Sequence, residues 1–155
     1  MQIELSSHAQ VIYSIMQQAY IEYEQAGMPS SALKETIESI QKDLEAGEQA
    51  FIGYESTGKP VAMVRFQMNE NYLYFSRLSV LPECRGKGFA KELLKELEAY
   101  AIQNGISEIR CKVRKNVERN ILLYTNMGYQ IYEEELGHLV NGDAITIVSM
   151  KKQVS

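Results

Sequence analysis

A loop of two glycines and two basic residues stands directly before a predicted helix and has the residue types of an anion site. Residues 85–88 read Arg-Gly-Lys-Gly, and the apolar pattern of a helix begins at Phe89. The first backbone N–H groups of a helix have no partner within it and carry a partial positive charge, which suits a phosphate. The glycines let an anion approach the backbone, and the arginine and lysine can add charge-assisted hydrogen bonds. The same residues could instead form only a tight turn.

The surroundings of the loop favour an anion site over a plain turn. The loop follows a predicted strand and leads into a helix, where anions bind in strand–loop–helix crossovers. A nucleoside triphosphate site would need the pattern G-x-x-x-x-G-K-[ST], which residues 85–88 do not fit. A dinucleotide site would need G-x-G-x-x-G, but position 91 is lysine. Both of these nucleotide classes are therefore disfavoured.

Two arginines fall within predicted strands that are otherwise apolar or aromatic. Arg65 and Arg77 lie on the two arms of a predicted hairpin, and we expect them to lie close together across it. A charged residue in the middle of a strand needs a partner or an opening to solvent. These arginines could bind a carboxylate or phosphate on a substrate. Alternatively, they could form a structural ion pair with a helix glutamate or be exposed at the edge of the sheet.

The apolar patterns that must position these residues predict a single domain over residues 1–155. Helical spacing covers 11–20, 33–44, 89–101 and 118–127, with Ser7 as the N-cap of the first helix. Strands are predicted at 3–5, 49–54, 61–68, 72–81, 107–113, 129–135 and 144–150, so the order is β-α-α-β-β-β-α-β-α-β-β. The helical crossover makes the strands at 72–81 and 107–113 parallel, whereas the hairpins are antiparallel. The expected fold class is α/β (α+β), with a mixed, mostly antiparallel sheet flanked by helices.

Composition narrows the class of protein further. Hydrophobic residues make up 45% of the 155 residues, enough for one core, and the net charge of −4 argues against nucleic acid as a partner. No apolar run approaches the ~20 residues that cross a bilayer, and the first residues lack the features of a signal peptide. Cys84 and Cys111 lack metal-ligand spacing, so we expect no metal and no disulfide scaffold. These features are typical of a small soluble domain in a reducing cytoplasm, with no membrane partner.

Two separate segments resemble the GNAT N-acetyltransferase superfamily. Residues 85–90, Arg-Gly-Lys-Gly-Phe-Ala, fit its [Q/R]-x-x-G-x-[G/A] signature and follow its hydrophobic-Ser-Val-x-Pro lead-in. Residues 120–129 are similar to its N-x-x-L-Y-x-x-x-G-[F/Y] segment, and the order of predicted elements is similar from end to end. The resemblance implies a β-bulge in the strand at 72–81. It also implies a splay from the strand at 107–113, which opens a V-shaped slot for acetyl-CoA.

The resemblance also implies roles for individual residues. Acetyl-CoA is the implied co-substrate, and its contacts are expected at Ser79, Val80, Arg85, Gly86, Lys87, Gly88, Phe89, Ala90 and Asn120. Tyr124 matches the position that often protonates the departing CoA thiolate, which a phenol of pKa ~10 can do. Asn120 stands four residues before Tyr124, whereas many family members place the asparagine seven before, where this sequence has Val117.

The activity implied by the resemblance is transfer of an acetyl group to a primary amine of a small molecule or peptide by direct attack. The sequence identifies no general base. Glu22, Glu24 and Glu35 are candidates only because they are acidic, and each is expected instead to be a solvated charge on a helix surface. The segment 28–31, Met-Pro-Ser-Ser, is expected to border the acceptor cleft as a specificity loop. Two alternatives are a non-catalytic acyl-CoA-binding or regulatory domain and a domain that binds neither ligand. Since dimers are common among proteins that resemble this one, a homodimer is one expected assembly.

Overall fold

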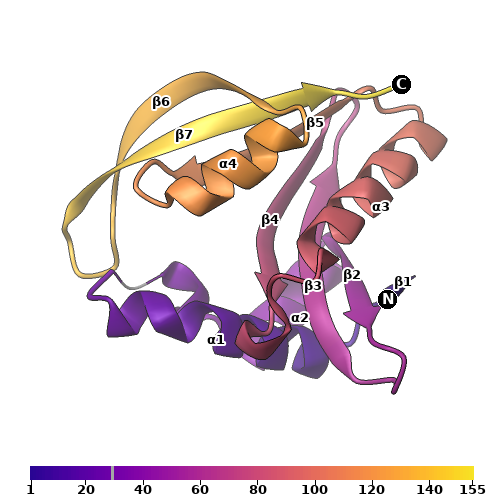
Figure 1. Cartoon of the computed structure of the whole chain (residues 1–155), viewed down its shortest axis with the longest axis horizontal. Helices are drawn as coiled ribbons and strands as arrows, with labels where there is room; N and C mark the ends of the chain where they lie inside the picture. Colours follow the sequence, from indigo (N-terminus) through magenta and orange to yellow (C-terminus); the bar gives the residue numbers. More distant parts are fainter. Residues whose placement is uncertain (29) are drawn as a thin grey trace.

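The computed structural model describes residues 1–28 and 30–155, so Pro29 of the predicted specificity loop lies outside the described residues. Within these ranges, seven strands form one open sheet in the order β1-β2-β3-β4-β5-β7-β6 (Figure 1). The β4–β5 pair is parallel and the other neighbouring pairs are antiparallel. The strands are β1 (Gln2–Leu5), β2 (Gln49–Tyr54), β3 (Pro60–Met68), β4 (Leu73–Val80), β5 (Glu108–Arg114), β6 (Gln130–His138) and β7 (Ala144–Gln153). This arrangement confirms the predicted fold class.

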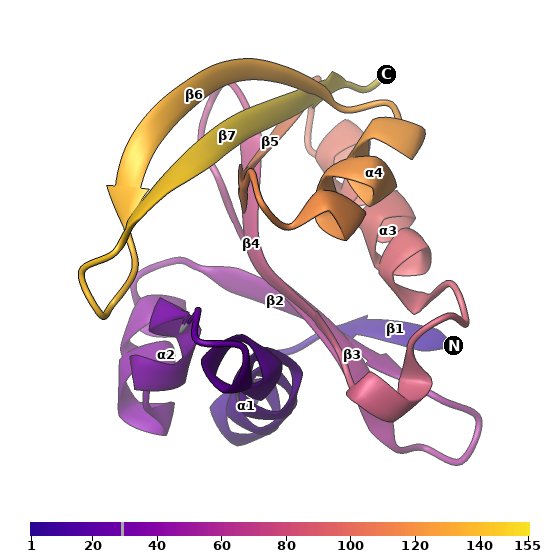
Figure 2. The same ribbon diagram turned by 60° about the vertical axis from the view of Figure 1, so that its left-hand side comes forward.

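Helices cover both faces of the sheet. In Figure 2, α1 and α2 lie on one face, and α3 and α4 lie on the other. The helices are α1 (Ala9–Gln25), α2 (Ile37–Glu45), α3 (Phe89–Gln103) and α4 (Glu118–Asn126), with short 3-10 helices at Ser31–Lys34 and Pro82–Cys84. The crossover from β4 through α3 to β5 therefore places the loop before α3 at the carboxyl end of β4.

Two helix starts differ from the prediction. His8, not Ser7, is the N-cap of α1, because its Nδ1 accepts a hydrogen bond from the Val11 N–H at 3.4 Å. The apolar stripe at 33–44 is divided between a 3-10 helix and α2. Thr36 is extended and forms a reciprocal capping box with Ser39, and these local side-chain bonds start a new helix instead of continuing the previous one.

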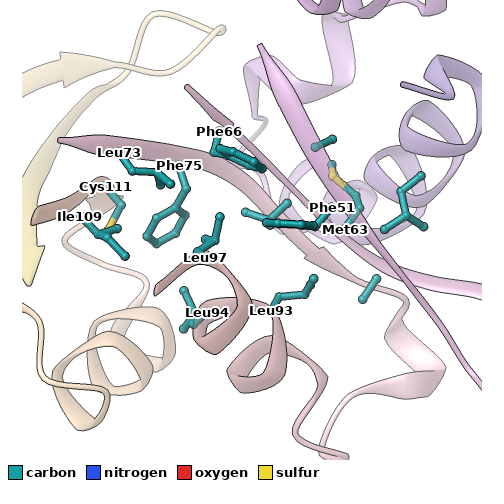
Figure 3. Packing of buried hydrophobic residues seen from close by; sticks show 14 of the residues in the cluster. Phe51, Met63, Phe66, Leu73, Phe75, Leu93, Leu94, Leu97, Ile109 and Cys111 are labelled. Carbon is teal, nitrogen blue, oxygen red and sulfur yellow. The ribbon is translucent and has the colours of Figure 1, made fainter. Parts of the chain in front are cut away.

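The side of the sheet covered by α3 carries the core that holds β4 and β5 in place (Figure 3). The apolar stripe of α3 packs against alternate side chains of both strands. The fully or nearly fully buried members of this cluster include Leu73, Phe75, Leu93, Leu94, Leu97, Ile109 and Cys111. Burying each large apolar side chain contributes about 1.5–3 kcal/mol relative to exposure, so this packing fixes the relative positions of β4, α3 and β5.

A bulge interrupts the pairing of β4 with β3. Met63 lies opposite Ser79, but Arg65 lies opposite Ser76, so β4 holds one more residue than β3 between these two pairs. Arg77, within the bulge, has φ +56°, in the left-handed region that residues other than glycine seldom adopt. A bulge bends its strand and increases the local twist, and here it turns the second half of β4.

The parallel pairing of β4 with β5 is short. Leu73 pairs with Ile109 and Tyr74 pairs with Arg110, and the register extends no further along the described strands. β5 continues to Arg114 on the other side, where it pairs with β7. The second half of β4 therefore presents an open edge toward β5, as the predicted bulge and splay require.

Candidate active site

A cleft of about 500 Å³ opens where β4 and β5 diverge. Its lining comes from residues 74–80 of β4, the end of β5, the last turns of α1, one side of α4 and the β6–β7 hairpin. The hairpin curls toward α1 in both views of the fold (Figures 1 and 2). The volume lies within the ~300–1,000 Å³ typical of small-molecule sites.

The loop before α3 presents backbone amides that the protein does not use. Gly86 and Gly88 have φ of +80° and +81°, the left-handed conformation that glycine adopts without a steric penalty. Gly88 is the N-cap of α3, and no side chain caps the helix. Among the described residues, no backbone carbonyl accepts a hydrogen bond from the N–H groups of residues 86–91. Arg85 and Ala90 line the cleft, whereas Gly86, Lys87, Gly88 and Phe89 lie outside its lining.

The backbone N–H and C=O groups of successive residues in β4 point to opposite sides of the strand, and this alternation decides which of them face the cleft. The Leu81 N–H donates to the Val61 carbonyl at 2.9 Å, so the backbone groups of residues 79 and 81 point toward β3. Those of Leu78 and Val80 point away from β3, toward the open edge. The backbone of Val80 therefore faces the open edge, whereas that of Ser79 faces β3. We therefore expect Leu78 to supply the second backbone contact in place of Ser79.

Tyr124 and Asn120 line the cleft from α4. Tyr124 is 6% exposed, and its ring lies 5.6 Å from the ring of Phe75 in an edge-on arrangement. Burial, reinforced by nearby Cys111, raises the pKa of Tyr124 well above 10, so its hydroxyl stays protonated. Burial also raises the pKa of the Cys111 thiol, which is therefore not a nucleophilic thiolate at neutral pH. This part of the cleft can supply a proton.

The two strand arginines share a carboxylate but have different surroundings. Arg65 is 3% exposed and bonds to Glu35 at 2.7 Å, to Asp43 at 2.9 Å and to Glu48. Arg77 donates from Nε to the other carboxylate oxygen of Glu35 at 3.0 Å. Arg77 lines the cleft, whereas Arg65 does not. The surroundings of Arg65 are those of the structural ion pair considered as the alternative, and Arg77 combines an ion pair with a place in the cleft.

Replacing Arg65 with methionine is expected to lower the free energy of unfolding by about 2–4 kcal/mol, because three carboxylates would lose their common cation. Urea unfolding of the variant measures this change. The matched control is Lys59→Met, which breaks an exposed pair with Glu83 at 3.7 Å and should change stability by less than about 0.5 kcal/mol. Equal effects of the two substitutions would contradict a central structural role for Arg65.

The cleft also contains basic and imidazole side chains that the sequence analysis did not assign. Lys112 and Arg114 of β5, Arg119 of α4 and His138 of β6 all line it. The first two alternate with the buried side chains of Cys111 and Val113. This period of two, which places basic residues on one face of the strand, is the signal in the sequence that could have identified them.

Glu22 and Glu35, which were predicted to be solvated helix charges, both form ion pairs, and the Glu22 side chain remains about one-third exposed. Glu22 binds Arg85 at 2.7 Å and also binds Arg119, which links the last turns of α1 to the loop before α3 and to α4. Burial alone would raise the pKa of Glu22, but the hydrogen bonds from the two arginines outweigh it and hold the pKa below its usual value. Glu22 is therefore ionised and already engaged at neutral pH.

Comparison with known proteins gives the family of this fold and cleft. The model of the acetyltransferase (GNAT) family matches residues 10–129, most of the chain. The chain belongs to the GNAT acetyltransferase family. It is also 30% identical over 104 residues to the UPF0157 protein YqkA of Bacillus subtilis (strain 168), an alignment that covers 67% of this chain and 28% of that protein. The chain therefore spans only about a quarter to a third of the length of this curated relative.

Solved structures share the fold at low sequence identity. The ribosomal-protein-S18-alanine N-acetyltransferase of Escherichia coli aligns with a TM-score of 0.80 at 17% identity, covering 99% of this chain and 95% of the other. A chimera of spermidine N-acetyltransferase from Vibrio cholerae and hSSAT aligns with a TM-score of 0.78 at 17% identity, covering 99% and 96%. At these identities the likeness shows the fold and leaves the acceptor open.

Two further features are absent from the part of the chain that the structure describes. Within residues 1–28 and 30–155, no group of three or more His, Cys, Asp or Glu side chains is arranged to hold a metal ion. None of the helices formed by the described residues has both the length and the apolar character needed to cross a bilayer.

Proposed function

We propose that this chain transfers an acetyl group from acetyl-CoA to a primary amine by direct attack of the amine on the thioester. The observation that carries the proposal is the continuity of three features. Unused amides at the start of α3 lie at the carboxyl end of β4, the open edge of β4 leads along the cleft, and the protonated hydroxyl of Tyr124 lines the same cleft. Membership of the GNAT family supports acyl transfer as the class of reaction.

The residues present fit acetyl-CoA. The N–H groups of residues 86–91 would hold its pyrophosphate, with Arg85 and Lys87 adding positive charge. The backbone groups of Leu78 and Val80 at the open edge would pair with the amides of the pantetheine arm, as a further strand would, and the Leu78 carbonyl also accepts a hydrogen bond from the Tyr20 hydroxyl at 3.4 Å. Asn120 would contact the same arm from α4. When bound, acetyl-CoA supplies an activated acetyl group and a thiolate leaving group.

Proton movements follow from the residues around the cleft. The acceptor nitrogen forms a bond to the acetyl carbon as the carbon–sulfur bond breaks, and Tyr124 donates its proton to the departing sulfur. The nitrogen then loses its extra proton to solvent, and solvent returns a proton to Tyr124. An alkylammonium of pKa ~10.4 must first lose a proton, which costs about 4 kcal/mol near pH 7.5. Glu22 is a weak base because its two arginine partners stabilise its ionised form. We therefore propose that the acceptor ammonium loses this proton to solvent through the open cleft.

Two measurements together test the proposal. Calorimetry with acetyl-CoA reports binding, and release of free CoA thiol across a panel of primary amines reports turnover. Binding with turnover supports the acetyltransferase, whereas binding without turnover on any amine would favour the regulatory acyl-CoA-binding domain. Thermal shifts with acetyl-CoA, desulfo-CoA and ATP test the remaining alternative, because stabilisation by none of them would mean that the loop binds no such ligand.

The proposal also covers the domain, the cellular compartment, the acceptor and the assembly. The continuous sheet and its core support one acetyltransferase domain over residues 1–155. Cys84 and Cys111 are free, buried thiols, which suits a reducing cytoplasm. We propose a small-molecule or peptide amine as the acceptor, a homodimer as the assembly, and neither nucleic acid nor a membrane as a partner.

A further inference from the structure

We infer that the acceptor amine also carries a carboxylate, which Arg77 and Arg114 bind on the α1 side of the cleft. This inference rests on the proposed acetyl transfer and specifies its acceptor. It is carried by the distribution of charge in the cleft, by the way each arginine is held, and by the absence of a spare carboxylate in the described lining. These three observations are independent of the site proposed for the pyrophosphate.

The charge of the cleft opposes that of the whole chain. The chain has a formal net charge of −4, yet basic side chains dominate the cleft. Its described lining contains the basic residues Arg77, Arg85, Lys112, Arg114 and Arg119, and Glu22 as its acidic residue. Glu22 is bound to Arg85 and Arg119, beside the loop before α3. Glu35, which pairs with Arg77, lies outside this lining, so basic side chains outnumber acidic ones among the described residues that face the cleft, and this favours an anionic ligand.

Hydrogen bonds to Glu35 and Ser31 hold the Arg77 guanidinium in place and leave some of its N–H donors for a ligand. Its Nε donates to Glu35 at 3.0 Å, and its Nη2 donates to the Ser31 hydroxyl at 3.0 Å. Glu35 lies outside the cleft lining and also binds Arg65, so it anchors Arg77 to the body of the protein. Among the described residues, nothing accepts a hydrogen bond from the Nη1 group of Arg77. A guanidinium held in this way is suited to bind a carboxylate.

Arg114 lies on the same wall of the cleft. Its Nη1 donates to the Met28 carbonyl at 3.0 Å, and its guanidinium carbon lies 5.4 Å from the centre of the Tyr23 ring. Burial lowers the pKa of Arg114, and the neighbouring Arg77 acts in the same direction. The two cations therefore repel each other, and a carboxylate bound to both would relieve that repulsion.

Among the described residues, the rest of this wall supplies aromatic rings and no free carboxylate for a second cation. Tyr20 and Tyr23 of α1 form a tilted aromatic pair with ring centres 5.4 Å apart. Burial raises the pKa of Tyr20 to about 12, so its phenol stays neutral, and its hydroxyl donates to the Leu78 carbonyl at 3.4 Å. A polyamine would bring extra positive charge to this wall, where the described residues offer it no free carboxylate. We therefore expect spermidine to be a poor acceptor, although a spermidine N-acetyltransferase chimera shares the fold.

The test compares matched acceptors that differ only in the carboxylate. The kcat/KM of wild type is measured for L-leucine, L-phenylalanine and L-glutamate and for their α-amides. The ratio of acid to amide is then measured for Arg77→Gln and Arg114→Gln. Because the two amines of a pair differ in basicity, the change in this ratio between wild type and variant is the informative quantity. We expect each variant to lower the ratio about tenfold or more, which is the worth of one charge-assisted hydrogen bond.

Controls separate substrate binding from folding. Arg77→Lys retains the charge and should keep more of the preference for the acid than Arg77→Gln does. Affinity for acetyl-CoA should change by less than about threefold in all three variants, since the residues proposed to hold it are untouched. An unchanged ratio of acid to amide in both glutamine variants would overturn the inference, as would efficient acetylation of spermidine by wild type.

Failure of the proposed function would give a different result. If no amine released CoA thiol, acetyl transfer would be refuted, and the anion site would be tested by binding alone. Calorimetry would then compare N-acetyl-L-phenylalanine with its amide in the presence of CoA. Preference for the acid in wild type and its loss in Arg77→Gln would support the carboxylate site. Equal affinity for the two ligands would refute it.

Discussion

Replacement of Tyr124 with phenylalanine is expected to lower kcat by about 100-fold and to change the affinity for acetyl-CoA by less than about threefold. The ring and its packing against Phe75 would remain, and only the proton donor to the departing sulfur would be lost. Steady-state kinetics with a saturating amine and calorimetry with acetyl-CoA measure the two quantities separately. The pH profile adds a readout. Because burial raises the pKa of Tyr124, wild-type kcat should not fall through loss of the tyrosine proton below about pH 10.

Tyr129 provides a matched control for this substitution. Its ring lies 5.8 Å from that of Tyr124, and it is 2% exposed but outside the cleft lining. Its buried hydroxyl has no hydrogen-bond partner among the described residues. Tyr129→Phe should therefore leave kcat unchanged and raise the free energy of unfolding by about 1 kcal/mol. Full turnover in the Tyr124 variant, or an equal loss of kcat in both variants, would remove the assignment of Tyr124 as the proton donor.

Replacement of Gly88 with aspartate is expected to weaken acetyl-CoA binding by about 100-fold. The substitution places a negative charge at the N-cap of α3, where the unused amides would meet the pyrophosphate, and like charges at ~4 Å repel by about 1–4 kcal/mol in partly solvated surroundings. A Cβ at this position meets no atom within 4 Å, so the fold has room for the side chain. Calorimetry with acetyl-CoA measures the loss of affinity, and urea unfolding checks that the variant remains folded.

Gly58→Asp is a control for Gly88→Asp. It shows whether a loss of acetyl-CoA affinity comes from the anion site or only from strain of the backbone. Gly58, between β2 and β3, has φ +87° and is also free of atoms within 4 Å of an added Cβ, so it matches Gly88 in both respects. It lies outside the cleft lining, and its substitution should cost similar stability without changing the affinity for acetyl-CoA. If Gly88→Asp bound acetyl-CoA as tightly as wild type, the pyrophosphate would have to bind elsewhere.

Features that depend only on residues close together in the sequence could be predicted from the sequence. Apolar periods identified the seven strands and four helices, because a strand or helix must bury one repeating set of its own side chains. The glycine loop and the segment around Tyr124 were identified for the same reason, since each acts within one turn or one helix. The bulge and the splay followed from the resemblance, and the structure contains both.

Tertiary packing decided the rest of the site. The bulge at Arg77 sets the parity of β4 and so directs the backbone of Leu78, rather than Ser79, toward the cleft. Docking of α1 and α2 on the sheet brings Glu35 to both strand arginines and Glu22 to Arg85, across separations of 30 to 63 residues. No local period encodes such contacts, because they depend on the distance and angle at which whole helices pack. For the same reason, the sequence indicated a loop where an anion could bind, and only the folded chain showed which basic residues line the cleft.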